Sequence, residues 1–229
     1  MKLNLYLARS GVASRRKSAE LIKEGRVSVN GETVLVPSRE VAGKDKVSVD
    51  GKKVAPERFV YIAVNKPIGF TCTLKDRFAE KKVTDLVPRS LGRLYPVGRL
   101  DRDSSGLVIL TNDGDFSQRL SHPSYEAEKE YLVTVTPPVS RKEAAVLKAG
   151  VLYEAEKLSA SEVVILNNDS GKSTLQVILK EGKKREIRRM FGCLGHHVLT
   201  LRRMRIGNIM LGKLELGKHR FLTEEEITT

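Results

Sequence analysis

The stretch that governs how this chain is interpreted is Pro96-Val97-Gly98-Arg99-Leu100-Asp101-Arg102-Asp103-Ser104-Ser105-Gly106-Leu107. It places an arginine, an apolar residue and an aspartate in a loop with a glycine on either side, directly before the apolar residues 107–110. A catalytic group can be held accurately at the start of a rigid strand, and a loop makes it accessible. On these residues alone, a catalytic aspartate and a solvated Arg–Asp pair in an ordinary turn are equally good interpretations.

Apolar patterns on both sides of this loop predict a sheet. We expect strands at residues 59–64, 107–110, 131–135 and 175–179, and helices at 115–120, 141–148 and 185–194. Because few helices separate the strands, an α+β fold with a mostly antiparallel, mixed sheet flanked by helices is favoured over a doubly wound fold. We assign residues 59–229 to this domain and residues 55–58 to a linker.

Residues 1–54 are expected to form a small separate domain of two helices and a hairpin sheet. The first helix ends near Gly11, and the second spans residues 15–24, with Ser14 as its N-cap and Gly25 as its stop. Two alternating Val-Ser-Val segments each run into a turn dipeptide, Asn30-Gly31 and Asp50-Gly51, which is the pattern of a tight hairpin.

The net charge of +13 is concentrated in two segments. Residues 1–58 carry +6 and residues 180–206 carry +7, so the rest of the chain is neutral. An excess of charge that served solubility alone would be spread evenly. Two basic segments around a neutral body instead favour contact with a polyanion such as nucleic acid.

The clearest basic cluster is Arg15-Arg16-Lys17, in the first turn of the second predicted helix. Cations at this end oppose the helix dipole, so a structural role explains them poorly, whereas binding of phosphate explains them well. Lys23 and Arg26 extend the cluster. The segment closely resembles the RNA-binding domain shared with ribosomal protein S-four, which implies RNA binding but no reaction.

Several other classes of protein are not expected. No run of eighteen apolar residues and no secretory signal are present, so we expect a cytoplasmic protein. Cys72 and Cys193 lie far apart and form no metal-binding pair. Gly171-Lys172-Ser173 mimics the end of a phosphate-binding loop, but Leu166 stands where the upstream glycine is required, so no nucleotide cofactor is expected.

A series of motifs resembles the pseudouridine synthases, with the RsuA/RluB group of ribosomal RNA enzymes as the close match. The central motifs are Gly98-Arg99-Leu100-Asp101 and Ser105-Gly106-Leu107. The others are Val64-Asn65-Lys66-Pro67-x-Gly69, Thr111-Asn112-Asp113-Gly114, Lys129-Glu130-Tyr131 and Glu181-Gly182-Lys183-x-Arg185-Glu186-Ile187-Arg188-Arg189. Their order and spacing agree over nearly the whole chain. One departure is Ser104, where the family more often has threonine, which also carries a hydroxyl.

The resemblance implies an isomerase that converts a uridine of ribosomal RNA to pseudouridine. Such an enzyme cleaves the bond between ribose and N1 of uracil, rotates the base and rejoins it through C5. The net change is an isomerisation, so no metal or redox cofactor is required. The implied partner is ribosomal RNA or a ribosomal assembly intermediate, and we expect a monomer that binds neither a membrane nor a nucleotide cofactor.

The resemblance also implies roles for four residues. The family's catalytic aspartate corresponds to Asp101, which acts either as a nucleophile on ribose or as a base that removes a sugar proton. Both roles require an ionised carboxylate, which a closed pocket disfavours unless a cation holds it; Arg188 is the family's position for that cation. Arg99 corresponds to the arginine that fills the stack when the base is flipped out, and Tyr131 to the ring that packs against the flipped uracil.

Alternatives to these interpretations stay open. Tyr131 could be a core aromatic, and Arg188 could contact phosphate, as we expect of Lys183 and Arg185. The chain could also be a non-catalytic RNA-binding or ribosome-assembly factor, or a synthase that acts on transfer RNA. Arg188, where some small-subunit enzymes of the group carry lysine, favours large-subunit over small-subunit ribosomal RNA. The sequence does not identify the target uridine, nor whether naked RNA or an assembly intermediate is the substrate.

Overall fold

The computed structural model describes residues 1–73 and 80–228, which form two compact units. The first consists of Met1–Val60 together with Ser90–Arg93, and the second of Tyr61–Arg89 and Leu94–Thr229. Each unit has its own cluster of buried apolar side chains.

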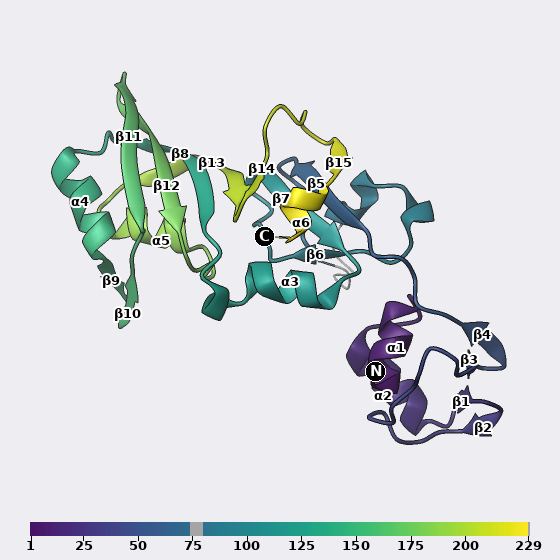
Figure 1. Ribbon diagram of the computed structural model, residues 1–229. Coiled ribbons are helices and arrows are strands. Elements are labelled where there is room, and N and C mark those ends of the chain that lie inside the picture. The colour runs from purple at the N-terminus through teal and green to yellow at the C-terminus, as the bar shows by residue number, and fades with distance from the viewer. Residues whose placement is uncertain (74–79, 229) are drawn as a thin grey trace. The chain divides into compact units, whose positions relative to one another are not determined.

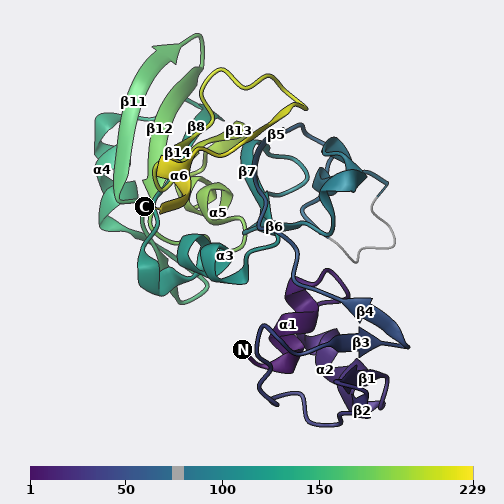
Figure 2. The ribbon, with the colours of Figure 1, turned by 45° about the vertical axis from the view of Figure 1, so that its right-hand side comes forward.

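The first unit is a helix pair beside a small antiparallel sheet (Figure 2). Helix α1 (Leu3–Arg9) contacts α2 (Arg15–Lys23), and their apolar side chains share one core with the strands. The sheet has the order β2-β1-β3-β4. Its strands are β1 (Val27–Val29), β2 (Glu32–Thr33), β3 (Val47–Val49) and β4 (Lys52–Val54).

The predicted helix and turn signals of this unit are confirmed. The Ser14 hydroxyl accepts a hydrogen bond from the backbone N–H of Lys17 at 3.3 Å, so it caps α2, which ends one residue earlier than expected. Asn30 and Asp50 both have positive φ and are each followed by a glycine, as tight hairpins require.

The second unit is built on a nine-stranded sheet (Figure 1). Its main path is β11-β12-β8-β13-β7-β5-β15, with β14 paired to β13 and β6 paired to β7. Among the described residues only β7 and β13 run parallel, so the predicted α+β fold with a mostly antiparallel sheet is confirmed. The strands are β5 (Tyr61–Lys66), β6 (Tyr95–Val97), β7 (Ser105–Thr111), β8 (Lys129–Thr136), β11 (Glu162–Asp169), β12 (Lys172–Leu179), β13 (His197–Ile206), β14 (Ile209–Met210) and β15 (His219–Phe221).

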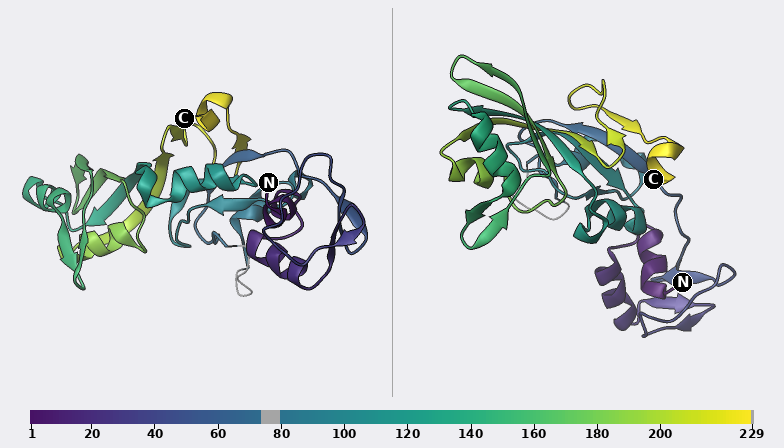
Figure 3. Two further views of the ribbon diagram at one scale, coloured as in Figure 1. Left: turned by 60° about the horizontal axis from the view of Figure 1, so that its bottom comes forward. Right: turned by 60° about the vertical axis from the view of Figure 1, so that its left-hand side comes forward.

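Helices cover parts of this sheet. Helix α3 (Gly114–Ser121) contacts β6, α4 (Arg141–Ala149) contacts β11, and α5 (Glu186–Cys193) contacts β13 (Figure 3). The remaining elements are the 3-10 turns η1 (Val83–Leu86), η2 (Arg89–Leu91) and η3 (Pro123–Tyr125), the hairpin of β9 (Val151–Tyr153) with β10 (Glu156–Leu158), and helix α6 (Glu224–Thr228). In the described ranges, no helix is long and apolar enough to span a membrane.

Several strands were not expected from the sequence. The ten-residue β13 contains three arginines, and β11 lies at the edge of the sheet with mostly exposed side chains. No strand bounds were predicted for either segment, nor for the short strands β6, β9, β10, β14 and β15. In addition, β5 begins at Tyr61 instead of residue 59.

Gly106 permits the close parallel approach of β7 and β13. It has a φ of +105°, and a Cβ atom added there would lie 2.3 Å from the carbonyl oxygen of Arg203 and 2.6 Å from its amide nitrogen. Arg203 is also the register partner of Gly106. No side chain fits between these backbones, so packing requires a glycine at position 106.

Replacing Gly106 with alanine should therefore destabilise the second unit by more than about 3 kcal/mol, since backbone atoms must move apart. The matched control is Gly171→Ala, in the turn between β11 and β12, where φ is +85° and no atom lies within 4 Å of the added Cβ. That change should cost only about 1 kcal/mol, from backbone strain alone. Urea unfolding of both variants measures the difference, and equal costs would contradict the role of the close approach.

Candidate active site

The loop that carries Asp101 joins β6 to β7 and is held by its backbone. The amide of Leu100 points at the Sγ of Cys72 at 3.5 Å, and the carbonyl of Arg102 accepts a hydrogen bond from the N–H of Gly69 at 2.8 Å. The carbonyl of Asp101 itself accepts from the N–H of Ser104 at 3.1 Å. These contacts fix the main chain of Asp101 while its side chain remains partly exposed.

A cavity of about 570 Å³ opens beside this loop. Five of the predicted site residues line it: Arg99, Asp101, Tyr131, Lys183 and Arg185. Arg188 lines a smaller cavity of about 290 Å³, and Arg185 lines both. The larger volume lies within the range of pockets that enclose drug-sized ligands, which is also the size of a nucleoside.

Strand β8 contributes two side chains to the larger cavity. Lys129 and Tyr131 are two residues apart, so they face the same side of the sheet, and both line the cavity. Glu130 faces the other side, where its carboxylate lies 3.0 Å from Nε of Arg205 on β13. Tyr131 is 7% exposed, which places its ring against the cavity and not in solvent.

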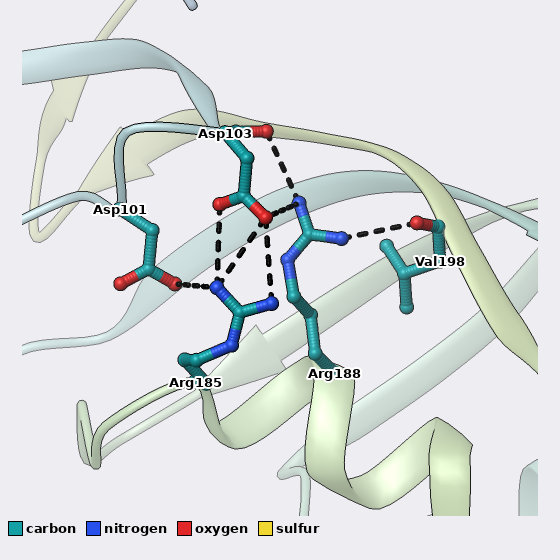
Figure 4. A network of polar contacts seen from close by, with 5 residues as sticks. All are labelled: Asp101, Asp103, Arg185, Arg188 and Val198. Carbon is teal, nitrogen blue, oxygen red and sulfur yellow. Dashed lines mark hydrogen bonds and ion pairs between the residues drawn. The ribbon is translucent and has the colours of Figure 1, made fainter. Parts of the chain in front are cut away.

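Asp101 and Asp103 form a polar network with two arginines at the start of α5 (Figure 4). Arg185 lies with Nη1 3.7 Å from the Asp101 carboxylate and 3.3 Å from the Asp103 carboxylate. Nη2 of Arg188 is 3.2 Å from the Asp103 carboxylate and also donates to the Asp103 carbonyl, while Nη1 donates to the carbonyl of Val198 at 3.0 Å. The network thus links the loop, α5 and β13.

This geometry corrects one expected contact. The cation beside Asp101 is Arg185, which we expected on phosphate, whereas Arg188, the expected partner of Asp101, pairs with Asp103. The two arginines are three residues apart where the helix begins, so they reach the same loop side by side. Arg185 has a left-handed φ of +52°, a conformation that the sequence did not indicate.

Two buried cations, Lys66 and Arg203, hold the backbone around the Asp101 loop in place. Lys66 is fully buried and donates to the carbonyls of Pro67 and Phe70, and its burial lowers the pKa of its ammonium. Arg203 is 3% exposed, and it donates to the carbonyl of Leu107 at 2.8 Å and of Arg99 at 3.4 Å. The two bonds of Arg203 tie the loop, at Arg99, and the strand after it, at Leu107, to β13.

The basic segment 180–206 is therefore less available to RNA than its net charge suggested. Arg203 is buried, and Arg205 pairs with Glu128 and Glu130 at 3.0 Å each. The Lys183 ammonium lies 2.9 Å from Glu181, which raises its pKa. Lys183 as an RNA contact stays a prediction.

Glu186 is an additional carboxylate that lines the cavity. It is 4% exposed, accepts a hydrogen bond from the backbone N–H of Lys183 at 2.9 Å, and has a pKa raised mainly by burial. No group of three or more metal-ligating side chains is found in the part of the chain that the structure describes.

In the first unit, Arg15, Arg16, Lys17 and Lys23 are exposed, as binding to phosphate requires. Lys17 also pairs with Glu20 at 2.9 Å. Arg26 differs, because its guanidinium forms a bidentate pair with Asp50 at 3.0 and 2.6 Å, which raises the pKa of Arg26. A contact of Arg26 with RNA stays a prediction, and its pairing across the sheet is an additional structural role.

Sequence reasoning did not single out Lys129, Arg203 or Glu186 as cavity residues. For Lys129 a signal existed, since strand alternation places it on the side of Tyr131. For Arg203 the register across the sheet was needed, and that register depends on the unexpected strand β13.

Comparison with known proteins agrees with this geometry. A family model described as RNA pseudouridylate synthase matches residues 60–192, and one described as the S4 domain matches residues 1–47. The ribosomal large subunit pseudouridine synthase B of Bacillus subtilis is 40% identical over 99% of this chain and 93% of its own length. The dual-specificity RNA pseudouridine synthase RluF of Salmonella typhi is 36% identical over 99% of this chain and 77% of its own length. A crystal structure of a pseudouridylate synthase superimposes with a TM-score of 0.71 at 31% identity, over 99% of this chain and 98% of the other.

The fold and these matches define an RNA-modifying isomerase. The chain belongs to the RNA pseudouridylate synthase family and carries an S4 domain at its N-terminus.

The network in Figure 4 gives a prediction for Asp103. Asp103→Asn keeps the shape but removes the charge that holds both arginines, so the rate on RNA should fall about tenfold, equivalent to ~1.4 kcal/mol, while RNA affinity is kept. Single-turnover kinetics measures this. Asp169→Asn, in the β11–β12 hairpin, is the control with the same chemical change, and an unchanged rate for Asp103→Asn would contradict the role of the network.

Proposed function

We propose that this protein converts a specific uridine of large-subunit ribosomal RNA to pseudouridine. The observation that carries the proposal is the cavity that brings together Asp101 of the loop before β7, Tyr131 of β8 and the guanidinium of Arg185. The choice of ribosomal RNA is supported by the name of the Bacillus subtilis relative, which spans nearly the same length. The identity of Arg188 supports the large subunit.

We propose that Asp101 is the catalytic carboxylate. Its role is either to attack C1′ of ribose as a nucleophile or to remove the proton from C2′ as a base, and both need the ionised form. The Arg185 guanidinium lies 3.7 Å from this carboxylate and places a positive charge beside it. Arg188 acts one step further away, because it holds Asp103, which in turn holds Arg185.

Tyr131 and Arg99 act on the nucleotide itself. The buried ring of Tyr131 packs against the flipped uracil, and the exposed side chain of Arg99 at the mouth of the cavity replaces the base in the RNA stack. Flipping is unfavourable by itself, so these contacts must offset the loss of stacking and pairing.

The first unit supplies affinity for RNA. We propose an RNA-binding domain at residues 1–54, a linker at 55–58 and a catalytic domain from residue 59. The division of the chain after Val60 and the S4 match to residues 1–47 support it. Arg15, Arg16, Lys17, Lys23 and Arg26 would contact phosphates near the target, with Lys183 and Arg185 contacting RNA at the cavity. Tethering the two domains raises the effective concentration of the cavity at its uridine.

We further propose that the partner is ribosomal RNA or an assembly intermediate, that the protein acts as a monomer, and that it works in the cytoplasm. The RNA partner is supported by the S4 domain and by the relatives, which modify RNA. The cytoplasmic location follows if the substrate is bacterial ribosomal RNA, which is made and assembled in that compartment.

Asp101→Asn should reduce pseudouridine formation by at least ~10³-fold, because the neutral amide can neither attack nor take a proton. RNA affinity should be unchanged, since only a partly exposed carboxylate is altered. The measurement is site-specific primer extension on ribosomal RNA from cells that lack the gene and express either form. Asp103→Asn, with its smaller expected loss, is the matched control within the same loop.

Full activity of Asp101→Asn would exclude the assigned role. If ribosomal RNA from cells that lack the gene still contained every pseudouridine found in the parent cells, the proposed substrate would be excluded.

Affinity for RNA should depend steeply on salt, with a log–log slope of about −0.7 for each single-strand phosphate contact. Replacing Arg15, Arg16 and Lys17 together with glutamine should make the slope less negative by about 2. The control replaces the exposed Arg141, Lys142 and Lys148 of α4, which removes the same charge elsewhere. Equal salt slopes for both triple variants, measured by filter binding, would argue against phosphate contacts at α2.

A further inference from the structure

We propose that Lys129 is a catalytic residue that stabilises the negative charge carried by the uracil ring after its bond to ribose breaks. The inference rests on the proposed function, because it concerns the base that occupies the cavity beside Asp101.

The position of Lys129 suits this role. It begins β8, lies on the same face as Tyr131, and lines the cavity together with Tyr131 and Asp101. A ring that packs on Tyr131 would therefore have the Lys129 side chain on the same side of the sheet, with the two Cα atoms about 7 Å apart along the strand. Lys129 is 9% exposed, so little water can screen its charge.

The ammonium of Lys129 lacks a close counterion. Its Nζ donates to the carbonyl of Lys180 at 3.4 Å, and among the described residues no carboxylate lies within 4 Å of it. The charged groups that act on it are Arg203 of β13, Glu186 of α5 and Glu181 after β12; burial and Arg203 lower its pKa, and the two glutamates raise it. The Glu186 carboxylate is itself occupied by the N–H of Lys183.

An isolated buried cation is unfavourable unless an anion joins it. Neither Glu186 nor Glu181 forms an ion pair with Lys129, and Arg203 adds a second positive charge. A buried cation beside the cavity gains a counterion if an anion forms on the bound base. The phosphates of RNA are anionic from the start, but the uracil ring is neutral in the substrate, so an anion on the base forms only during the reaction.

The chemistry produces this anion by either route. When Asp101 is a nucleophile, a carboxylate oxygen bonds to C1′ and the electron pair of the C1′–N1 bond stays on N1, delocalised over O2 and O4. When Asp101 is a base, it takes the proton from C2′, the C1′=C2′ double bond forms, and the pair again stays on N1. In the second half, C5 bonds to C1′ as the carboxylate leaves or returns its proton to C2′, and the C5 proton is replaced by one on N1.

Lys129 is better suited to this task than Arg203 and Arg185, two other cations that line the cavity. The guanidinium of Arg203 is held by the carbonyls of Leu107 and Arg99 through Nε and Nη1, although its Nη2 has no partner in the described part of the chain, and that of Arg185 pairs with Asp103 and Asp101. Only a donor whose interactions are free to strengthen as charge develops can lower the barrier.

The test compares the wild-type protein with Lys129→Met on RNA that contains uridine or 5-fluorouridine at the target position, under single-turnover conditions at neutral pH. On uridine, the variant should consume the target about 10²-fold more slowly, as when one preorganised donor is removed. On 5-fluorouridine the deficit should shrink to about tenfold or less, because fluorine itself stabilises the anion.

Because both rates come from the same variant, partial misfolding would lower them equally. Equal deficits on the two bases, or no deficit on uridine, would overturn the proposal. Lys148→Met, an exposed lysine of α4, should match the wild-type protein on both. An inactive wild-type protein would instead refute the proposed function, so the two failures are distinguishable.

The pH dependence offers a second readout. A protonated Lys129 contributes at neutral pH and loses its charge as pH rises through its lowered pKa. The ratio of wild-type to Lys129→Met rates should therefore fall from about 10² toward unity at alkaline pH, while ionisation of uridine cancels in the ratio. A ratio that is constant with pH would overturn the proposal.

Discussion

The parallel contact between β7 and β13 at Gly106 is the constraint on which the rest of the site depends. The Asp101 loop leads into β7, α5 with its two arginines leads into β13, and β8 pairs with the other edge of β13. Register then aligns Tyr131 of β8, Arg203 of β13, Gly106 of β7 and Lys66 of β5 in one row across four strands. Because a side chain at Gly106 would force β7 and β13 apart, this one glycine brings elements from distant parts of the chain to a common cavity.

Several positively charged side chains near the cavity are buried, although protein interiors ordinarily exclude charged groups. Lys66, Lys129 and Arg203 are buried, and burial lowers the pKa of both lysines. Carbonyl oxygens accept hydrogen bonds from Lys66 and from Nε and Nη1 of Arg203, so these two cations hold backbone segments together, although Nη2 of Arg203 has no partner among the described residues. Lys66 also interacts electrostatically with Asp103 and Asp101 of the loop, which partly offset the lowering of its pKa by burial. Positive charge thus serves as a structural support and as the electrostatic environment of the loop.

The sequence predicted those features that local physics determines. Ser14 as a cap, the Asn30-Gly31 turn and the glycines next to the Asp101 loop all act within a few residues, and the structure contains each of them. The features that the sequence did not predict depend on hydrogen bonding between strands that lie far apart in the chain. Strand β13 was not predicted because its arginines interrupt the apolar pattern, and their partners lie on β7 and β8. The pairing of Arg185 with Asp101 and of Arg188 with Asp103 was not predicted, and neither was the left-handed backbone at Arg185. The resemblance of the motifs identified the position of the site in the sequence. The partners of its residues depend on the register between the strands of the sheet.

An isomerisation explains why the site needs opposite charges at fixed positions. No group enters or leaves, so any charge that develops on the ribose and on the base must be balanced by side chains of this protein. Asp101 lies in the loop before β7 and Lys129 at the start of β8, and β13 lies between these two strands in the sheet. The order of the strands therefore keeps the two groups apart. A base that rotates between the two groups would keep its sugar near the carboxylate and its ring near the ammonium, which is the arrangement that an internal transfer requires.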